Sequence, residues 1–156
     1  VSASPNHQVG RRTSFKMRAD VAIGGNFGFE LDLGQLSEED LASAKAYVTA
    51  IKSLRHLTAA GTFSRLLSPF EGNYTAWQFY DGSQLLLCIY RVLSEPNPIA
   101  HRVLLTGLDP QAHYLSEDGP FAGKVFTGAA LMQAGLPMIF ETRGDFSSRT
   151  LRFTRQ

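Results

Sequence analysis

The sequence predicts an α+β fold in two unequal parts: a helix–strand–helix segment over residues 1–57 and an antiparallel β-sandwich over residues 58–156. In the first part, apolar residues recur mainly at helical spacing. After Ala60 they alternate in short runs separated by turn signals. A helix–strand–helix piece cannot bury both faces of its strand alone, so we expect residues 1–57 to be the remnant of a larger α/β domain.

The composition indicates a globular chain. It has 156 residues, of which 44% are hydrophobic and 19% charged, and the hydrophobic share is too high for a disordered protein. The net charge of +1 and the absence of long like-charged runs predict no nucleic-acid partner and no anionic membrane surface. The longest apolar run, Leu85–Tyr90, falls well short of the roughly 20 residues that span a bilayer.

The first helix and the strand are predicted from spacing and stop signals. Thr13 or Ser14 can N-cap a helix that runs to about Ile23, where Gly24-Gly25 ends it. Apolar and polar residues then alternate over Phe27–Leu33, which predicts a strand.

The second helix carries the clearest local signal in the chain. Ser37 can act as the N-cap, and the acidic residues Glu38–Asp40 occupy the first turn, where they complement the helix dipole. Apolar residues then follow helical spacing to about Arg55.

The second part is predicted to contain several short strands, which is typical of a β-sandwich. A helical turn over Thr127–Gln133, ended by Gly135 and Pro137, interrupts them. The strand candidates, in chain order, are Thr62–Leu67, Tyr74–Tyr80, Gln84–Leu93, Arg102–Leu105 and Arg149–Phe153.

The chain offers no clear metal or cofactor site. Its single cysteine, Cys88, excludes an internal disulfide and a cysteine zinc cluster, and its place in an apolar run favours an inert core thiol over a nucleophile. The four histidines are scattered and include no i, i+4 pair. We therefore predict no cofactor and no metal.

Short motifs along the whole chain carry a family resemblance. They are Ser4–Arg11, Gly25–Leu33, Leu36–Glu39, Arg65–Asn73, Gly107–Pro110, Gly135–Pro137 and Gly144–Phe146. In this order they resemble the C-terminal end of glycoside hydrolase family 36 α-galactosidases (melibiases). The resemblance implies that residues 1–57 are the end of the catalytic (β/α)₈ barrel, and that residues 58–156 are the C-terminal β domain with a structural role.

The resemblance implies a retaining hydrolase of α-1,6-linked galactosides such as melibiose and raffinose. Retaining enzymes use two carboxyl groups about 5–5.5 Å apart. In this family both are aspartates on earlier barrel strands, and the Lys-Trp-Asp and Ser-Asp-Asn-Thr-Asp motifs that carry them are absent here. We therefore expect no catalytic residue in this chain and no activity of the chain alone.

The start of the chain at Val1 suggests a cut in a longer protein. We expect this parent protein to be cytoplasmic and homo-oligomeric.

Five residues are candidates for a supporting position or for the rim of the sugar pocket: Asn6, His7, Gln8, Asn26 and Glu30. Loops that follow barrel strands line the active site, and amide and imidazole groups suit sugar hydroxyls. The alternatives are that His7 bonds to backbone and that Asn26 forms a turn. Glu30 and Asp32 share a strand face about 7 Å apart, which fits ion pairs or loop caps better than a retaining catalytic pair.

Two other functions remain open. Trp77 could belong to an aromatic platform of a carbohydrate-binding module, but Trp77 and Phe79 share a strand face, which favours a core position. A buried Trp77 would rule out the module. The parent could also be a related α-N-acetylgalactosaminidase. The basic residues Arg149, Arg152 and Arg155 are expected on a solvated strand face or a subunit contact.

Overall fold

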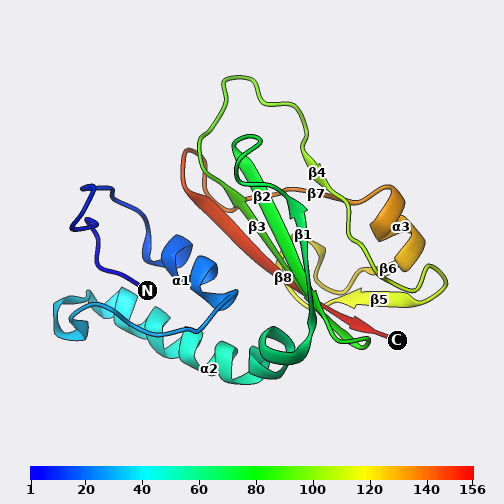
Figure 1. Cartoon of the computed structure of the whole chain (residues 1–156), viewed down its shortest axis with the longest axis horizontal. Coiled ribbons are helices and arrows are strands. Elements are labelled where there is room, and N and C mark those ends of the chain that lie inside the picture. The colour runs from blue at the N-terminus through cyan, green and yellow to red at the C-terminus, as the bar shows by residue number, and fades with distance from the viewer.

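The computed structural model describes residues 1–156 and is built around a six-stranded antiparallel sheet (Figure 1). The strand order is β1-β2-β3-β8-β5-β6, and β4 and β7 form a separate two-stranded sheet. The strands are β1 (Thr62–Leu67), β2 (Tyr74–Tyr80), β3 (Gln84–Arg91), β4 (Arg102–Val103), β5 (His113–Ser116), β6 (Val125–Thr127), β7 (Leu136–Pro137) and β8 (Ser147–Arg155). The helices are α1 (Phe15–Ile23), α2 (Glu38–Ala60) and α3 (Gly128–Gln133), with short 3₁₀ turns η1 (Leu33–Gln35) and η2 (Gly119–Phe121).

Both predicted N-terminal helices are present, and each begins at its predicted cap. The Ser14 hydroxyl accepts a hydrogen bond from the Met17 amide at 3.1 Å, and the Ser37 hydroxyl accepts one from the Asp40 amide at 3.1 Å. Helix α2 continues to Ala60, past the predicted end near Arg55. It continues because its last turns pack on the sheet and bury Leu57. No helix combines the length and the hydropathy that crossing a bilayer requires.

The predicted strand over Phe27–Leu33 does not form as a regular strand. A single parallel bridge joins Ser2 to Glu30, and the Asp32 carboxylate accepts the Gly34 amide at 2.9 Å to cap η1. A strand of a parallel sheet needs hydrogen-bonded neighbours along its length, and here only residues 1–2 lie beside it. The parallel sense of the bridge agrees with the predicted α/β character.

The predicted strands of the second part are confirmed, with changes at their ends. Strands β1 and β2 have the predicted bounds, β3 ends earlier at Arg91, β4 is reduced to two residues, and β8 is longer than predicted. Strands β5, β6 and β7 were not predicted. The helix at Thr127–Gln133 is confirmed, with the Thr127 hydroxyl accepting the Ala130 amide at 3.1 Å.

Strand β3 is buried on both faces, because layers cover the sheet from both sides. Its residues Leu85, Leu87 and Ile89 belong to the core shared with β4, β7 and α3. Its alternate residues Leu86 and Cys88 belong to the core shared with α1 and α2. The predicted α+β fold class is thus confirmed. The second layer of the sandwich is formed by the β4–β7 sheet and α3, and the helices of the first part cover the other face (Figure 1).

The environment of Cys88 makes it an unreactive thiol. Its side chain is 0% exposed, and burial raises its pKa to about 12. Because the thiolate is the reactive form, we expect no reaction with a disulfide reagent such as dithionitrobenzoate at mildly alkaline pH in the native state, and complete reaction in concentrated guanidinium. Fast modification of the native chain would contradict this burial.

Candidate functional site

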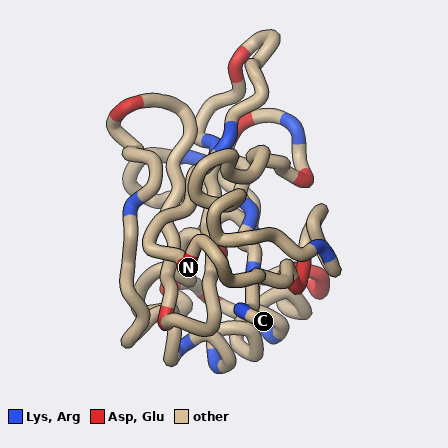
Figure 2. The backbone as a smooth tube through the Cα atoms, turned by 90° about the vertical axis from the view of Figure 1, so that its right-hand side faces the viewer, with Lys and Arg blue, Asp and Glu red and all other residues tan.

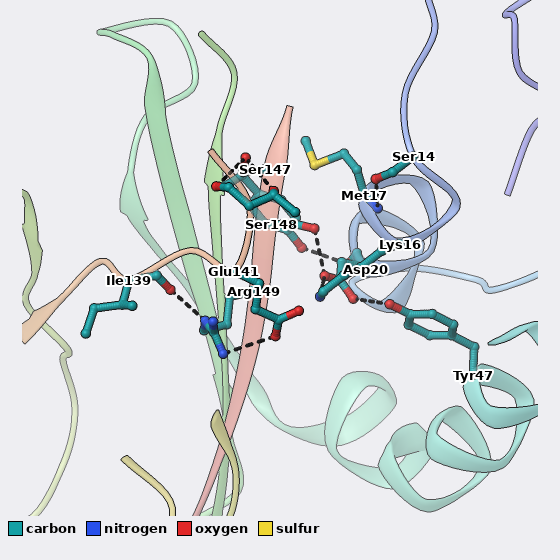
Figure 3. A network of polar contacts seen from close by, with 12 residues as sticks. Ser14, Lys16, Met17, Asp20, Tyr47, Ile139, Glu141, Ser147, Ser148 and Arg149 are labelled. Atoms are coloured by element: carbon teal, nitrogen blue, oxygen red, sulfur yellow. Dashed lines mark hydrogen bonds and ion pairs between the residues drawn. The ribbon is translucent and has the colours of Figure 1, made fainter. Parts of the chain in front are cut away.

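Asp20, on α1, is the centre of a polar network that joins both parts of the chain (Figure 3). It is 1% exposed. One carboxylate oxygen accepts hydrogen bonds from Lys16 Nζ at 2.6 Å and from the Ser148 hydroxyl at 2.7 Å. The other accepts one from the Tyr47 hydroxyl at 2.7 Å. The Tyr90 hydroxyl donates to the Asp20 carbonyl at 2.8 Å. A single residue therefore holds α1 to α2, β3 and β8.

The network fits a structural role for Asp20. A buried carboxylate is tolerated only when charged and hydroxyl donors replace the water it has lost, and here both of its oxygens are occupied. Burial, and then the neighbouring Asp20 carboxylate, raise the pKa of Tyr47, so this hydroxyl stays a neutral donor. Sequence reasoning did not single out Asp20. The available signal was an acidic residue at helical spacing from the buried Met17 and Ile23.

Of the five predicted site residues, the structure brings Asn6 and Gln8 together. Both line a hollow of about 550 Å³ between the loop before α1 and the β part, which contributes Val92 and Phe146. The Asn6 side-chain oxygen accepts the Gln8 amide at 3.0 Å and the Val9 amide at 3.1 Å, so it stabilises a turn.

The other three predicted residues lie elsewhere. His7 is exposed and outside the lining of that hollow. Asn26 borders a separate hollow of about 480 Å³ beside the C-terminal half of α2. Glu30 is exposed, and its backbone amide donates to the Val1 carbonyl at 2.9 Å. Asp32 acts as a loop cap.

Trp77 packs in the core shared by the helices and the sheet. It is half-buried, and its ring centroid lies 4.5 Å from that of Tyr90 at an interplanar angle of 35°. Gly24 closes over it, since a Cβ atom at Gly24 would lie 3.0 Å from the indole nitrogen. As predicted, Phe79 belongs to the same core. The ring therefore offers no flat exposed platform for a sugar.

Of the three arginines of β8, Arg149 differs from its predicted exposure, whereas the side chains of Arg152 and Arg155 remain 42% and 40% exposed. Arg149 is 7% exposed; its Nε donates to the Ile139 carbonyl at 2.6 Å, and its guanidinium lies 3.2 Å from the Glu141 carboxylate (Figure 3). Arg152 pairs with Asp118 at 2.9 Å. The predicted solvated face is wrong for Arg149, because the β7–β8 connection folds over this strand.

Charged residues of both signs occur in both parts of the chain, and the net charge is +1. Figure 2 shows Lys and Arg as well as Asp and Glu residues on the side of the molecule that it presents. No group of three or more His, Cys, Asp or Glu side chains is placed to hold a metal ion.

Two family models match the chain, in the order of its two parts. The model described as Melibiase matches residues 1–61, and the model of the glycosyl hydrolase family 36 C-terminal domain matches residues 74–153. The second match alone covers half of the chain and contains the sheet from β2 to most of β8. The chain therefore belongs to glycoside hydrolase family 36.

Curated relatives and solved structures agree with this assignment. Alpha-galactosidase AgaA of Geobacillus stearothermophilus is 44% identical over 97% of this chain and 20% of its own length. The structure of AgaB from the same organism has a TM-score of 0.92 at 45% identity, covering 100% of this chain and 21% of AgaB. The galactosidase domain of the α-galactosidase–sucrose kinase AgaSK has a TM-score of 0.93 at 36% identity, with the same coverage. Structures of AgaA variants contain raffinose or stachyose. This chain spans about a fifth of the length of these relatives.

Replacing Asp20 tests whether its network holds the two parts together. The change Asp20→Ala leaves the Lys16, Tyr47 and Ser148 donors without their acceptor, so we expect a loss of about 2–4 kcal/mol in the free energy of unfolding. Glu71→Ala, at an exposed loop carboxylate, serves as the control and should stay within about 0.5 kcal/mol. Urea titrations followed by circular dichroism measure both. Equal effects of the two changes would contradict this role.

Trp77 is the single tryptophan of the chain and reports directly on the binding-module alternative. Because its ring packs against Tyr90 and Gly24, we expect blue-shifted fluorescence that acrylamide quenches weakly and that galactose or raffinose leaves unchanged. A saturable change in the emission on adding either sugar would contradict this expectation and support a carbohydrate-binding role for Trp77.

Proposed function

We propose that this chain forms the C-terminal part of a retaining α-galactosidase that hydrolyses α-1,6-linked galactosides of the melibiose and raffinose type. The observation that carries the proposal is that two family models match the two parts of the chain in order, and that these two parts share one hydrophobic core. The identity to AgaA over nearly the whole chain supports the same reaction, and its complexes with raffinose and stachyose support this class of substrate.

In this proposal the chain supplies no catalytic carboxylate. Retention requires a nucleophile and an acid/base carboxyl group that face the same bond about 5–5.5 Å apart. Asp20 is saturated by donors, Asp32 caps η1, and Glu30 lies exposed outside the hollow lined by Asn6 and Gln8. None of these three groups has the setting of an activated acid or nucleophile. The nucleophile and the acid/base belong to barrel strands outside this chain.

The chain's own contribution is structural and positional. We place the boundary between the barrel end and the β domain near residues 57–58, and we assign the β domain the role of covering the last barrel helices. We also assign Asn6, His7, Gln8, Asn26 and Glu30 to the rim of the galactoside pocket or to its support. The location of Asn6 and Gln8 in one hollow supports this for two of them. A homo-oligomeric, cytoplasmic parent completes the proposal.

Hydrolysis of p-nitrophenyl α-galactoside by the purified chain, beside full-length AgaA, tests the proposal. We expect nitrophenol release by AgaA and none by the chain, because the chain lacks a suitable carboxylate pair. Turnover by the chain would place the pair within these residues. In that case Glu30→Gln and Asp32→Asn, made separately, would show whether these two carboxylates supply it.

The substrate class is tested by replacing the matching residues of AgaA with this chain. We expect the chimera to hydrolyse raffinose and melibiose with retention of configuration, which nuclear magnetic resonance of the first-formed sugar anomer detects. A correctly folded chimera that hydrolyses neither sugar would contradict the proposal.

A further inference from the structure

Two segments that lie at opposite ends of the sequence meet at the hollow lined by Asn6 and Gln8. One is the loop Asn6–Arg11 of the first part, and the other is Gly144–Phe146 of the β part. The guanidinium carbon of Arg11 lies 5.6 Å from the centroid of the Phe146 ring, and both residues line the hollow. A guanidinium at this distance from an aromatic ring is attracted by the negative charge of the ring face.

Phe146 adopts a backbone conformation that its type rarely takes. Its φ angle is 51°, in the left-handed region that disfavours a bulky side chain. Such a conformation persists only where the surroundings enforce it. Here the Phe146 amide donates to the Val92 carbonyl at 2.9 Å, and the ring packs against the core that contains Met17. The ring is thus directed from the β part toward the helices.

The segment that carries Phe146 is fixed to the β sheet by side-chain bonds. The Arg91 guanidinium donates to the Gly144 carbonyl at 3.0 Å and to the Thr142 carbonyl at 2.9 Å. The Asp145 carboxylate accepts the Ser94 amide at 2.7 Å. Arg91 is the last residue of the central strand β3. Its bonds therefore fix the segment that carries the Phe146 ring to the end of this buried strand.

The loop Asn6–Arg11, by contrast, is bonded largely within itself. The Gly10 amide donates to the Asn6 carbonyl at 2.8 Å, and the Asn6 amide donates to the Arg11 carbonyl at 2.8 Å. These bonds set the shape of the loop but not its place against the β part. The contact between Arg11 and Phe146 joins the end of the loop to the segment Gly144–Phe146, which Arg91 fixes to the sheet.

We propose that Phe146 is a positioning residue, which holds the loop Asn6–Arg11 in place through Arg11. The β domain then does more than cover apolar surface, because it orders the loop that carries Asn6 and Gln8. The significance of this order for galactoside binding rests on the function proposed above. The contact itself is a property of this chain and is measurable without substrate.

Amide hydrogen exchange, followed by nuclear magnetic resonance on the whole chain, tests the proposal. Phe146→Leu keeps an apolar side chain but removes the ring face, so we expect exchange at Gln8, Val9 and Gly10 to rise about two- to fivefold, the range for an exposed cation–π contact. Exchange in β3 should stay unchanged. Phe146→Tyr, which keeps the ring, should restore the wild-type loop rates. Phe63→Leu, at a 50% exposed ring on β1, is the matched control and should leave the loop unaffected.

Arg11→Gln approaches the same contact from the loop and leaves the core packing of Phe146 intact, so it decides the matter if Phe146→Leu fails to fold. It should raise loop exchange by a similar factor. Unchanged loop rates in Arg11→Gln, or an equal rise in the loop and in β3 for Phe146→Leu, would overturn the proposal. Absence of galactosidase activity in the AgaA chimera would instead contradict the proposed function and leave the loop contact standing.

Discussion

A carboxylate removed from water must recover its lost hydrogen bonds from the protein, and this requirement at Asp20 organises the structure. Its donors come from α1, α2 and β8, and its carbonyl takes a fourth bond from β3. None of these elements can shift alone without leaving a buried polar group unpaired. Apolar side chains of α1, α2 and the sheet form one shared core, and the directional bonds to Asp20 add a specific orientation to this non-directional packing.

The sheet has an equally specific place in the molecule. Strand β3 divides its side chains between two cores, one under α1 and α2 and the other under β4, β7 and α3. A strand covered on both faces favours apolar side chains at every position, in agreement with the unbroken run Leu85–Tyr90, and the one hydroxyl in that run, on Tyr90, is hydrogen-bonded to Asp20. The same strand ends in Arg91, which fixes the segment before β8. The central strand of the sheet thereby holds in place the segment with Phe146, which lines the same hollow as Asn6.

Sequence reasoning succeeded where structure is determined locally. The caps Ser14 and Ser37 bond to amides three residues away, and turn residues on either side delimit strands β1 and β2, so these bounds followed from the local sequence. It failed where partners come from distant residues. The segment Phe27–Leu33 alternates like a strand but finds a neighbour only at Ser2. The short strand β5 pairs with β8, β6 pairs with β5, and β7 pairs with β4, so each of the three depends on a partner that the local sequence does not show.

The candidate site shows the same division. The resemblance to family 36 identified the loop with Asn6 and Gln8, and these two residues do share a hollow. The network around Asp20 and the burial of Arg149 were not predicted, because they depend on contacts with Ser148 and with Ile139 and Glu141 that spacing does not reveal. A charged residue is interpreted as exposed by default, and only the fold shows which ones are enclosed.

Helix α2 passes into β1 through Gly61 without a linker. A side chain at Gly61 would place its Cβ atom 2.4 Å from the Leu57 carbonyl oxygen, so the helix ends and the sheet begins within one residue, in a fixed direction. A joint of this kind leaves no linker between α2 and β1, so the angle between them is set at a single residue. Because α2 also shares a core with β2 and β3, the orientation of the helices and that of the sheet are coupled both at this joint and along the packed faces.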